Sequence, residues 1–173
     1  SRLPSPVQLS ALTAAASGDI DDIGVAIAKS IGKQLAAQVA GSGPAGPPGG
    51  VKNFRGKRLN SRTIGMLLNA EKILGAAFHI TQGSYSTSVA ASGGTHSGGG
   101  AMDTNGPRGW GAAVSALRKV GFAAWHRTPG QGPWGHHIHS IAIGDSSASP
   151  AAKRQVQSYL RGGDGLGHGM ALG

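Results

Sequence analysis

The stretch that most limits the fold is residues 41–50, which reads Gly-Ser-Gly-Pro-Ala-Gly-Pro-Pro-Gly-Gly. Proline lacks a backbone N–H and glycine loses much conformational entropy when ordered, so this stretch cannot form the interior of a helix or strand. It predicts a linker between residues 1–40 and residues 51–165, with a flexible tail at residues 166–173. The second segment is long enough for one domain with its own hydrophobic core.

Residues 1–40 have the pattern of two helices. Ser5-Pro6 begins a short helix rich in Leu and Ala, and Asp19 begins a second one. The apolar residues of the second helix recur every three or four positions. They are Ile20, Ile23, Ile27, Ile31 and Leu35. This amphipathic pattern predicts a helix that packs on a neighbour and indicates no catalytic site.

The longer segment alternates between helical patterns and short runs of β-forming residues. The expected elements are a helix that Ser61 caps and Gly75 ends, a strand over 78–81, a loop over 83–100, a helix over 107–119, strands over 121–126 and 137–143, and a helix over 150–160. Strands and helices in this order predict an α+β fold, in which a small antiparallel sheet is flanked by helices.

The net charge of the chain predicts a polyanionic partner but does not distinguish between classes of polyanion. Sixteen Lys and Arg against seven Asp and Glu give a net charge of +9, which attracts nucleic acid, anionic lipid or an anionic cell-wall polymer. Five of the cations form a basic run that is either a solvated face or a binding surface. They are Lys52, Arg55, Lys57, Arg58 and Arg62.

Several classes of partner and location are disfavoured. The sequence has no aromatic stacking motif, helix-turn-helix pattern or zinc-finger spacing, which argues against nucleic acid as the partner. It has no apolar run of 18 residues, so we expect no membrane span. The chain begins at Ser1 without a methionine or signal peptide, from which we expect a processed product or a piece of a longer protein.

The absence of cysteine restricts the chemistry of any metal site. Disulfides, thiolate zinc fingers and a cysteine nucleophile are excluded, so a metal must be held by histidine and carboxylate. Side chains alternate along a strand, so His137 and His139 project to the same side. His96 and Asp103, seven residues apart in a glycine-rich stretch, are candidates to complete a site. Three N and O ligands with one open position are typical of catalytic zinc.

A simpler interpretation stays open beside this one. Asp103 would cap the helix that begins near Pro107, and the histidines would be surface or core residues.

These two segments together resemble the zinc peptidases of the D-Ala-D-Ala carboxypeptidase and dipeptidase group, whose fold is shared with the hedgehog signalling domain. That family is marked by His-x6-Asp and by a later His-x-His near a tryptophan. The matching residues are His96, Asp103, His137, His139 and Trp134. The resemblance covers roughly residues 52–165 and is nearest to the versions in actinobacterial phages, in endolysins and at the ends of tail tape-measure proteins.

The resemblance implies a hedgehog/DD-peptidase-like fold and assigns roles to single residues. Zinc would be bound by His96, Asp103 and His139. His137 would sit beside the bound water as the general base, with His126 or His136 as substitutes. The substrate-binding candidates are Gln82, Ser84, Tyr85 and His126. The polar residues of the stretch after the first strand can equally be turn formers.

Two departures from the family pattern refine the expected activity. Some relatives use a glutamate as base, but this chain has no Glu after Glu71; relatives that trim a terminal D-Ala often have an arginine where residues 82–86 have none. The missing glutamate favours a histidine base, and the missing arginine favours an endopeptidase over a carboxypeptidase or dipeptidase. The expected function is therefore a zinc-dependent peptidoglycan hydrolase that cuts stem or cross-link peptides of the bacterial cell wall.

The expected setting is a phage virion tail, or the host cell wall after release. The basic run would hold the enzyme on anionic wall polymers, and the N-terminal helices would contact phage tail proteins or other copies of the chain. The alternative function is a metal-stabilised structural fragment of a phage tail or tape measure without catalytic activity. A cupin-like oxygenase also uses His-x-His but needs a glutamate soon after it, which is absent.

Overall fold

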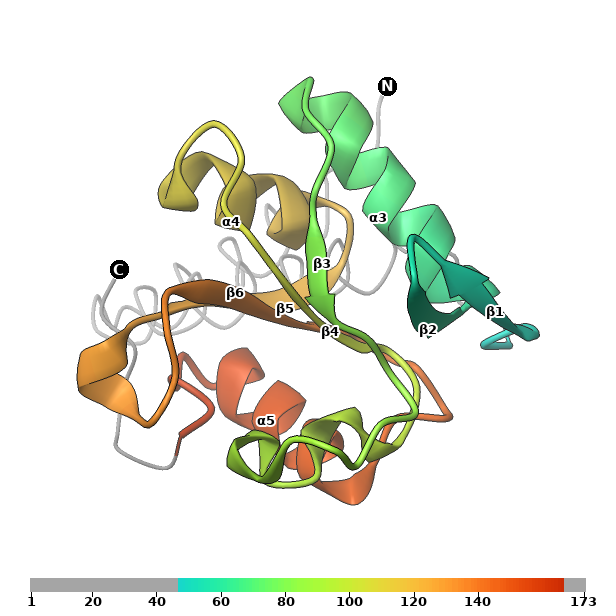
Figure 1. The fold of residues 1–173 in the computed structure, drawn as a ribbon, viewed down its shortest axis with the longest axis vertical. Helices are drawn as coiled ribbons and strands as arrows, with labels where there is room; N and C mark the ends of the chain where they lie inside the picture. Colours follow the sequence, from blue (N-terminus) through green and yellow to red (C-terminus); the bar gives the residue numbers. More distant parts are fainter. Residues whose placement is uncertain (1–46, 167–173) are drawn as a thin grey trace, which may run out of the picture. The chain divides into compact units, whose positions relative to one another are not determined.

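A computed structural model describes residues 47–166 (Figure 1). The helices expected in residues 1–40, most of the expected linker and nearly all of the expected tail lie outside the described residues. The described elements are β1 (Val51–Phe54), β2 (Lys57–Asn60), α3 (Ser61–Leu74), β3 (Ile80–Gln82), η1 (Ala90–Ser92), η2 (Thr95–Ser97), β4 (Ala101–Thr104), α4 (Trp110–Lys119), β5 (Phe122–Arg127), η3 (Pro129–Gln131), β6 (His137–Ala142) and α5 (Pro150–Leu160).

The centre of this part is a four-stranded sheet in the order β3-β4-β6-β5, with all neighbours antiparallel. Helices α3 and α4 cover one face of the sheet, and α5 lies on the other (Figure 1). Strands β1 and β2 form a separate two-stranded sheet beside α3. The predicted α+β class is therefore confirmed.

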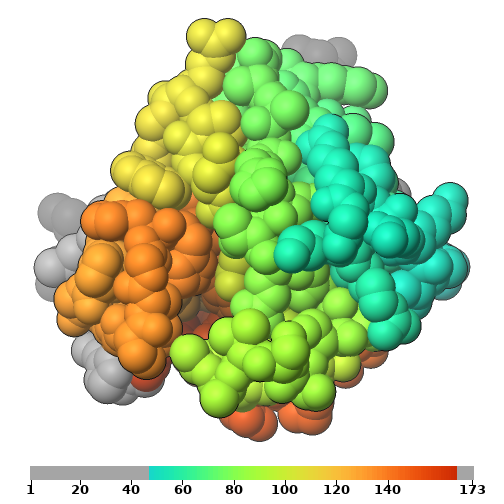
Figure 2. All heavy atoms as spheres, in the orientation of Figure 1, coloured from blue at the N-terminus to red at the C-terminus, as the bar shows by residue number. Residues whose placement is uncertain are grey.

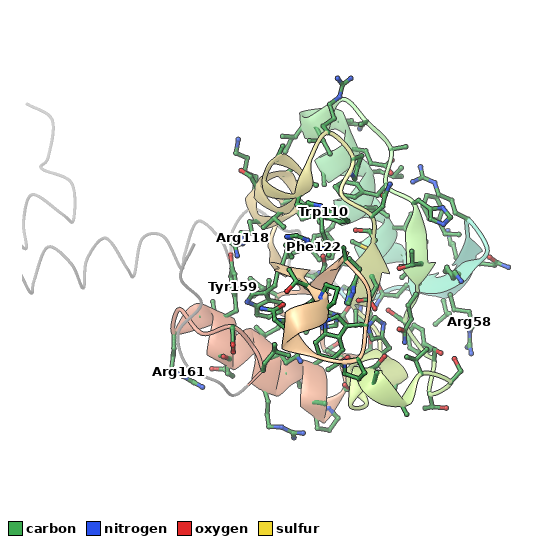
Figure 3. The ribbon with its side chains drawn as sticks, turned by 60° about the vertical axis from the view of Figure 1, so that its left-hand side comes forward. Arg58, Trp110, Arg118, Phe122, Tyr159 and Arg161 are labelled. Atoms are coloured by element: carbon green, nitrogen blue, oxygen red, sulfur yellow. The ribbon has the colours of Figure 1, made fainter. Side chains whose placement is uncertain are left out.

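Strand periodicity sorts the apolar residues into two clusters on the two faces. Alternate side chains point to opposite sides, so Ile138 packs toward α3 and α4 whereas Ile141 packs toward α5. The larger cluster includes Phe78, Met102, Leu117 and Phe122, and the smaller one includes Ala101, Ala123, Ala152 and Val156. Tyr159 borders the smaller cluster, with Arg118 5.4 Å above its ring (Figure 3). Only part of the α5 face is apolar, which leaves room for polar groups.

Helix α3 ends where predicted but has a different N-cap. Ser61 is its first helical residue, and the cap is Asn60, whose side chain accepts a hydrogen bond from Thr63 N at 2.8 Å. Ser61 N donates to Gly50 O at 3.1 Å, so the end of the expected linker is attached to the helix start. Gly75 ends the helix in the left-handed region with φ 66°, as predicted.

Five further elements differ from the sequence prediction: β1, β2, β3, β4 and α4. The β1–β2 hairpin and β4 were not predicted at all. Strand β3 begins at Ile80, two residues late, because the N–H groups of Phe78 and His79 donate to the side chains of Glu71 and Asn105. Helix α4 begins at Trp110 rather than near residue 107. Within residues 47–166, no helix is long and apolar enough to cross a membrane.

Candidate metal centre

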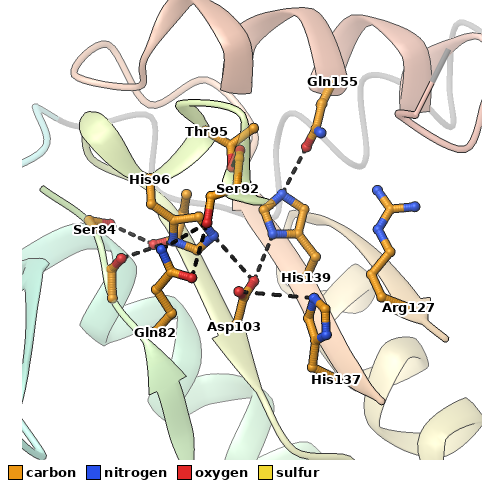
Figure 4. A network of polar contacts seen from close by, with 12 residues as sticks. Gln82, Ser84, Ser92, Thr95, His96, Asp103, Arg127, His137, His139 and Gln155 are labelled. Atoms are coloured by element: carbon orange, nitrogen blue, oxygen red, sulfur yellow. Dashed lines mark hydrogen bonds and ion pairs between the residues drawn. The ribbon is translucent and has the colours of Figure 1, made fainter. Parts of the chain in front are cut away.

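Three predicted metal ligands converge on the α5 face of the sheet. Asp103 and His139 are directly paired residues of the central strands β4 and β6, so their side chains project to the same side. His96 reaches the same point from η2. One ligand atom from each residue lies within 4.8 Å of the others, and the three side chains are buried (Figure 4). This buried group can hold a metal ion.

The hydrogen bonds around the two imidazoles decide which nitrogens are free to bind a metal. His96 Nδ1 lies 2.9 Å from Gly83 O, and His139 Nε2 lies 2.8 Å from Gln155 Oε1. Because these oxygens only accept, each ring donates to its oxygen through the outer nitrogen, and in the corresponding neutral tautomer the inner nitrogen carries the lone pair that binds a metal. The inner nitrogens, His96 Nε2 and His139 Nδ1, lie 3.3 and 2.7 Å from Asp103 Oδ1. In this tautomer three acceptors face one another and a cation satisfies all three, whereas in the hydrogen bond of 2.7 Å between His139 Nδ1 and Asp103 Oδ1 a proton takes the place of the cation.

The electrostatics favour the metal-binding forms of these groups. Burial opposes the charge of Asp103, but hydrogen bonds and attraction from His139 and His96 outweigh it and hold the pKa of Asp103 well below its usual range. Burial lowers the pKa of His139 despite the opposing effect of Asp103. At neutral pH the site thus combines a carboxylate with a neutral imidazole, which are the forms that coordinate metals.

The simpler interpretation of Asp103 as a helix cap is wrong. Asp103 lies within β4 and was expected in a loop, while α4 is capped at Gly109 without any side-chain hydrogen bond. The pairing of β4 with β6 places this carboxylate among the histidines.

His137, the predicted base, lies beside the three ligands but outside their group. It is the first residue of β6 and faces the same side as His139. Its Nε2 is 4.0 Å from Asp103 Oδ2, and its Nδ1 is 2.8 Å from Gly135 O. The bond to this carbonyl places the proton on Nδ1, so Nε2 has a free lone pair. This is the form in which an imidazole can accept a proton.

A cleft of about 670 Å³ runs along this group. Figure 2 shows a hollow between the segment around residues 129–137, in orange, and the segment that follows β3, in green. The predicted substrate residues Gln82, Ser84 and Tyr85 line it, as do Lys57, Arg58, Arg127, Trp134, His136, His137 and Gln155.

The three predicted substrate residues that line the cleft are all hydrogen-bonded within the protein; the Tyr85 hydroxyl lies 3.2 Å from Ser147 Oγ. Ser84 is buried and its hydroxyl donates to Ala101 O at 2.7 Å. The Gln82 side chain is paired with Ser92. Both therefore shape the wall of the cleft, whereas Tyr85 also brings an aromatic ring to it.

His126 is placed away from the cleft, unlike the other predicted substrate residues. It does not line the cleft; its ring stacks on Trp110 at 4.4 Å, and its Nε2 is 3.0 Å from His136 Nδ1. Burial and the nearby His136 and His137 lower the pKa of His126. Strand alternation explains the placement, since His126 points away from the face that carries Trp125 and Arg127.

The glycines between His96 and Asp103 allow a close backbone approach. A Cβ on Gly98 would lie 2.4 Å from Ser147 O and from Ser149 N, and one on Gly99 would lie 2.1 Å from Ser147 Oγ. Side chains at these positions would push the loop off the turn that precedes α5. The run therefore fits the loop against its own protein.

The basic run is divided by the fold. Arg55 forms an ion pair with Glu71, and Arg62 donates to Ile143 O at 2.7 Å. Lys57 and Arg58 line the cleft, and the Arg58 guanidinium lies 5.6 Å above the Tyr85 ring. Part of the run thus stabilises the fold, and part adds positive charge to the rim of the cleft.

Two residues at the site, Gln155 and Arg127, were not predicted from the sequence. Gln155 lies on α5, and no motif distinguishes it from Gln157, two residues further along, although the helix itself was predicted. Arg127 follows a predicted strand, and the alternation of Trp125 and Arg127 was a usable signal once that strand was paired with β6.

Comparisons with models of known protein families, with curated proteins and with solved structures give no match to this chain. The function of the site is therefore inferred from its geometry and from the motif residues themselves.

Proposed function

We propose that this chain is a zinc-dependent peptidoglycan hydrolase, an endopeptidase of the hedgehog/DD-peptidase type that cuts stem or cross-link peptides as part of a phage lytic protein. The observation that supports it most is the fixed orientation of His96 and His139. Their outer nitrogens lie within hydrogen-bond distance of Gly83 O and Gln155 Oε1, so the inner nitrogens of both rings are directed at Asp103. Metal-ligating histidines have this kind of outer hydrogen bond.

The donor set suits zinc, with two imidazole nitrogens and one carboxylate at the wall of an open cleft. When bound, zinc supplies Lewis acidity at a peptide carbonyl and lowers the pKa of water from 15.7 to about 7. His96, Asp103 and His139 would hold the ion, and the cleft would hold the peptide.

His137 has the position of a proton carrier in this reaction. Its free Nε2 faces the carboxylate side of the metal group, and its ring is held by the Gly135 carbonyl and by the edge of Trp134, 6.2 Å away. His137 accepts the proton of the attacking water and passes it to the leaving amine. General catalysis of this kind contributes roughly 10² to 10⁴ in rate.

The charge of the cleft fits a wall polymer. Lys57 and Arg58 stand at its rim, and with Lys52, Arg55 and Arg62 they would attract anionic wall polymers in a salt-dependent manner. The setting proposed from the motif is a phage tail or the host wall after release.

The test combines metal analysis with mass spectrometry of the fragments released from purified actinobacterial peptidoglycan. We expect one zinc ion per chain and peptide-bond cleavage by the parent chain. His96→Ala and Asp103→Ala should lose both zinc and cleavage, whereas His137→Ala should keep zinc and lose cleavage by roughly 10² to 10⁴. His79→Ala is the matched control, because His79 is exposed and does not line the cleft.

A metal-stabilised structural fragment is the second candidate. Burial of the three ligands and their origin in η2, β4 and β6 favour it, since a metal there would join three separate segments. It predicts zinc-dependent melting without any released fragment. Cleavage that persists in His96→Ala and Asp103→Ala would contradict the hydrolase.

A further inference from the structure

Arg127 lies next to the proposed base on the same face of the sheet. It is the last residue of β5 and pairs with His137 of β6. Directly opposite residues of antiparallel strands project to the same side, so Arg127 shares this face with His137 and His139. Its side chain lines the cleft (Figure 4), and its guanidinium lies 4.8 Å above the ring of Trp125.

The guanidinium is buried, and one of its two terminal nitrogens has no hydrogen-bond partner. The residue is only 2% exposed, and Nη1 donates to Asp164 O at 2.8 Å. Nη2 is buried without a hydrogen-bond acceptor, and within residues 47–166 no carboxylate forms an ion pair with Arg127. Burial lowers the pKa of Arg127 to about 10, so the group remains cationic at neutral pH.

An unpaired buried cation is costly for a fold unless a partner arrives. The planar guanidinium matches a carboxylate, which can accept two parallel N–H bonds. The carboxylates of Asp164 and Asp103 attract the guanidinium without forming an ion pair with it, and Asp103 is in contact with the two histidines. The missing partner of Arg127 is therefore an anionic group that comes from outside the described chain.

We propose that Arg127 binds a carboxylate of the substrate beside His137, and so selects anionic peptides whose free carboxylate lies close to the bond that is cut. This inference rests on the proposed hydrolase function and names its substrate class. Acidic residues within a stem peptide supply such a carboxylate. Amidation of that group would remove the charge and one acceptor, and the site would then discriminate against the peptide.

The other cations of the cleft do not explain such selection. Arg58 is exposed and Lys57 is partly exposed, and both belong to the hairpin at the rim. Solvent screens charges of this kind, so they attract anions generally without fixing one group. Arg127 alone combines burial, an unused donor and a position opposite His137 among the residues that line the cleft.

The test uses the full 173-residue chain and two synthetic stem peptides that differ in one carboxylate, free in one and a carboxamide in the other. Binding is measured by calorimetry and cleavage by chromatography. We expect the parent chain to bind the carboxylate peptide about 10 to 100 times more tightly, as hydrogen bonds to a charged group imply. In Arg127→Met this ratio should fall to about one.

Arg118→Met is the matched control. Arg118 also lies over an aromatic ring and donates to a backbone carbonyl, Ala124 O at 3.0 Å, but it does not line the cleft. It should keep the full preference. Arg127→Lys preserves the charge but not the planar set of N–H donors, so it should keep only part of the preference. If Arg127→Met does not fold, the Arg127→Lys variant provides the test.

The outcomes separate this inference from the proposed function. Equal binding of the two peptides by the parent chain, binding of neither, or a preference kept in both Arg127 variants overturns the role of Arg127, even if the peptides are cleaved. A preference that depends on Arg127 without any cleavage supports the carboxylate site and contradicts the hydrolase.

Discussion

Two oxygen atoms outside the metal group determine how its imidazoles are presented. Gly83 O and Gln155 Oε1 hold the outer nitrogens of His96 and His139. One is a backbone atom that no substitution removes, and the other belongs to a side chain on α5. Gln155 is therefore the residue through which metal binding can be weakened without touching a ligand.

We predict that Gln155→Ala lowers zinc affinity by about 10 to 100 times, the usual effect of removing such an outer hydrogen bond. The His139 ring would lose its preferred tautomer and orientation. Competition with a chelating dye measures the affinity. Gln157→Ala is the control, because Gln157 is exposed on the same helix and should leave the affinity unchanged. Equal affinities for both variants would contradict the role of Gln155.

At the scale of elements, Glu71 connects three parts of the fold. Its carboxylate pairs with Arg55 in the turn of the β1–β2 hairpin and accepts a hydrogen bond from Phe78 N at 2.8 Å, just before β3. Burial opposes the charge of Glu71, but these hydrogen bonds and the nearby Arg55 outweigh it and lower its pKa. The hairpin that carries Lys57 and Arg58 to the cleft is thus anchored to the end of α3.

We predict that Glu71→Gln lowers the free energy of unfolding at pH 7 by about 1 kcal/mol, a modest value because Arg55 is 36% exposed. The folded-state pKa of Glu71 lies below the unfolded value, so its contribution is present above that value and is lost as the pH falls below about 5. Denaturant unfolding at several pH values should therefore show the parent and variant converging in acid.

The control for this prediction is Lys72→Gln, an exposed neighbour on α3. It should leave the pH dependence of stability unchanged. A difference between Glu71→Gln and the parent chain that stays constant from pH 7 to pH 3 would show that the ionised carboxylate is not what anchors the hairpin.

The elements that could be predicted are those with local signals. Helices α3 and α5 have apolar periodicity and end signals such as Gly75 and Ser149-Pro150, and β5 and β6 are runs of β-formers. Strand β4 has no such signal, because all four of its residues are buried and it exists through pairing with β3 and β6. The hairpin turns at Arg55-Gly56, both with positive φ, and charged residues on its strands obscured the alternation.

At the scale of the whole domain, the metal group joins segments that are far apart in the chain. His96, Asp103 and His139 come from η2, β4 and β6, and α5 contributes Gln155. The three ligands are absent as a group in an unfolded chain, so metal binding and folding must be coupled.

We predict that zinc at about 100 times its dissociation constant stabilises the domain by about 2.7 kcal/mol. This corresponds to a rise in melting temperature of roughly 5 to 15 °C, measured by calorimetry with and without a chelator. Asp103→Asn, which is close in shape but lacks the charge, should melt at the same temperature in both conditions. If the melting temperature of the parent chain is the same with and without zinc, the chain has no metal site of this kind.

The sequence by itself determined the α+β class, most helices and the residues His96, Asp103 and His139, because periodicity, capping and motif spacing are local properties. Only the tertiary structure decided the rest. It placed Asp103 on a central strand opposite His139, turned His126 away from the cleft, and brought Gln155 and Arg127 to the site. The physical reason is that strand register and helix packing act between distant segments, and no local pattern encodes which side chains they bring together.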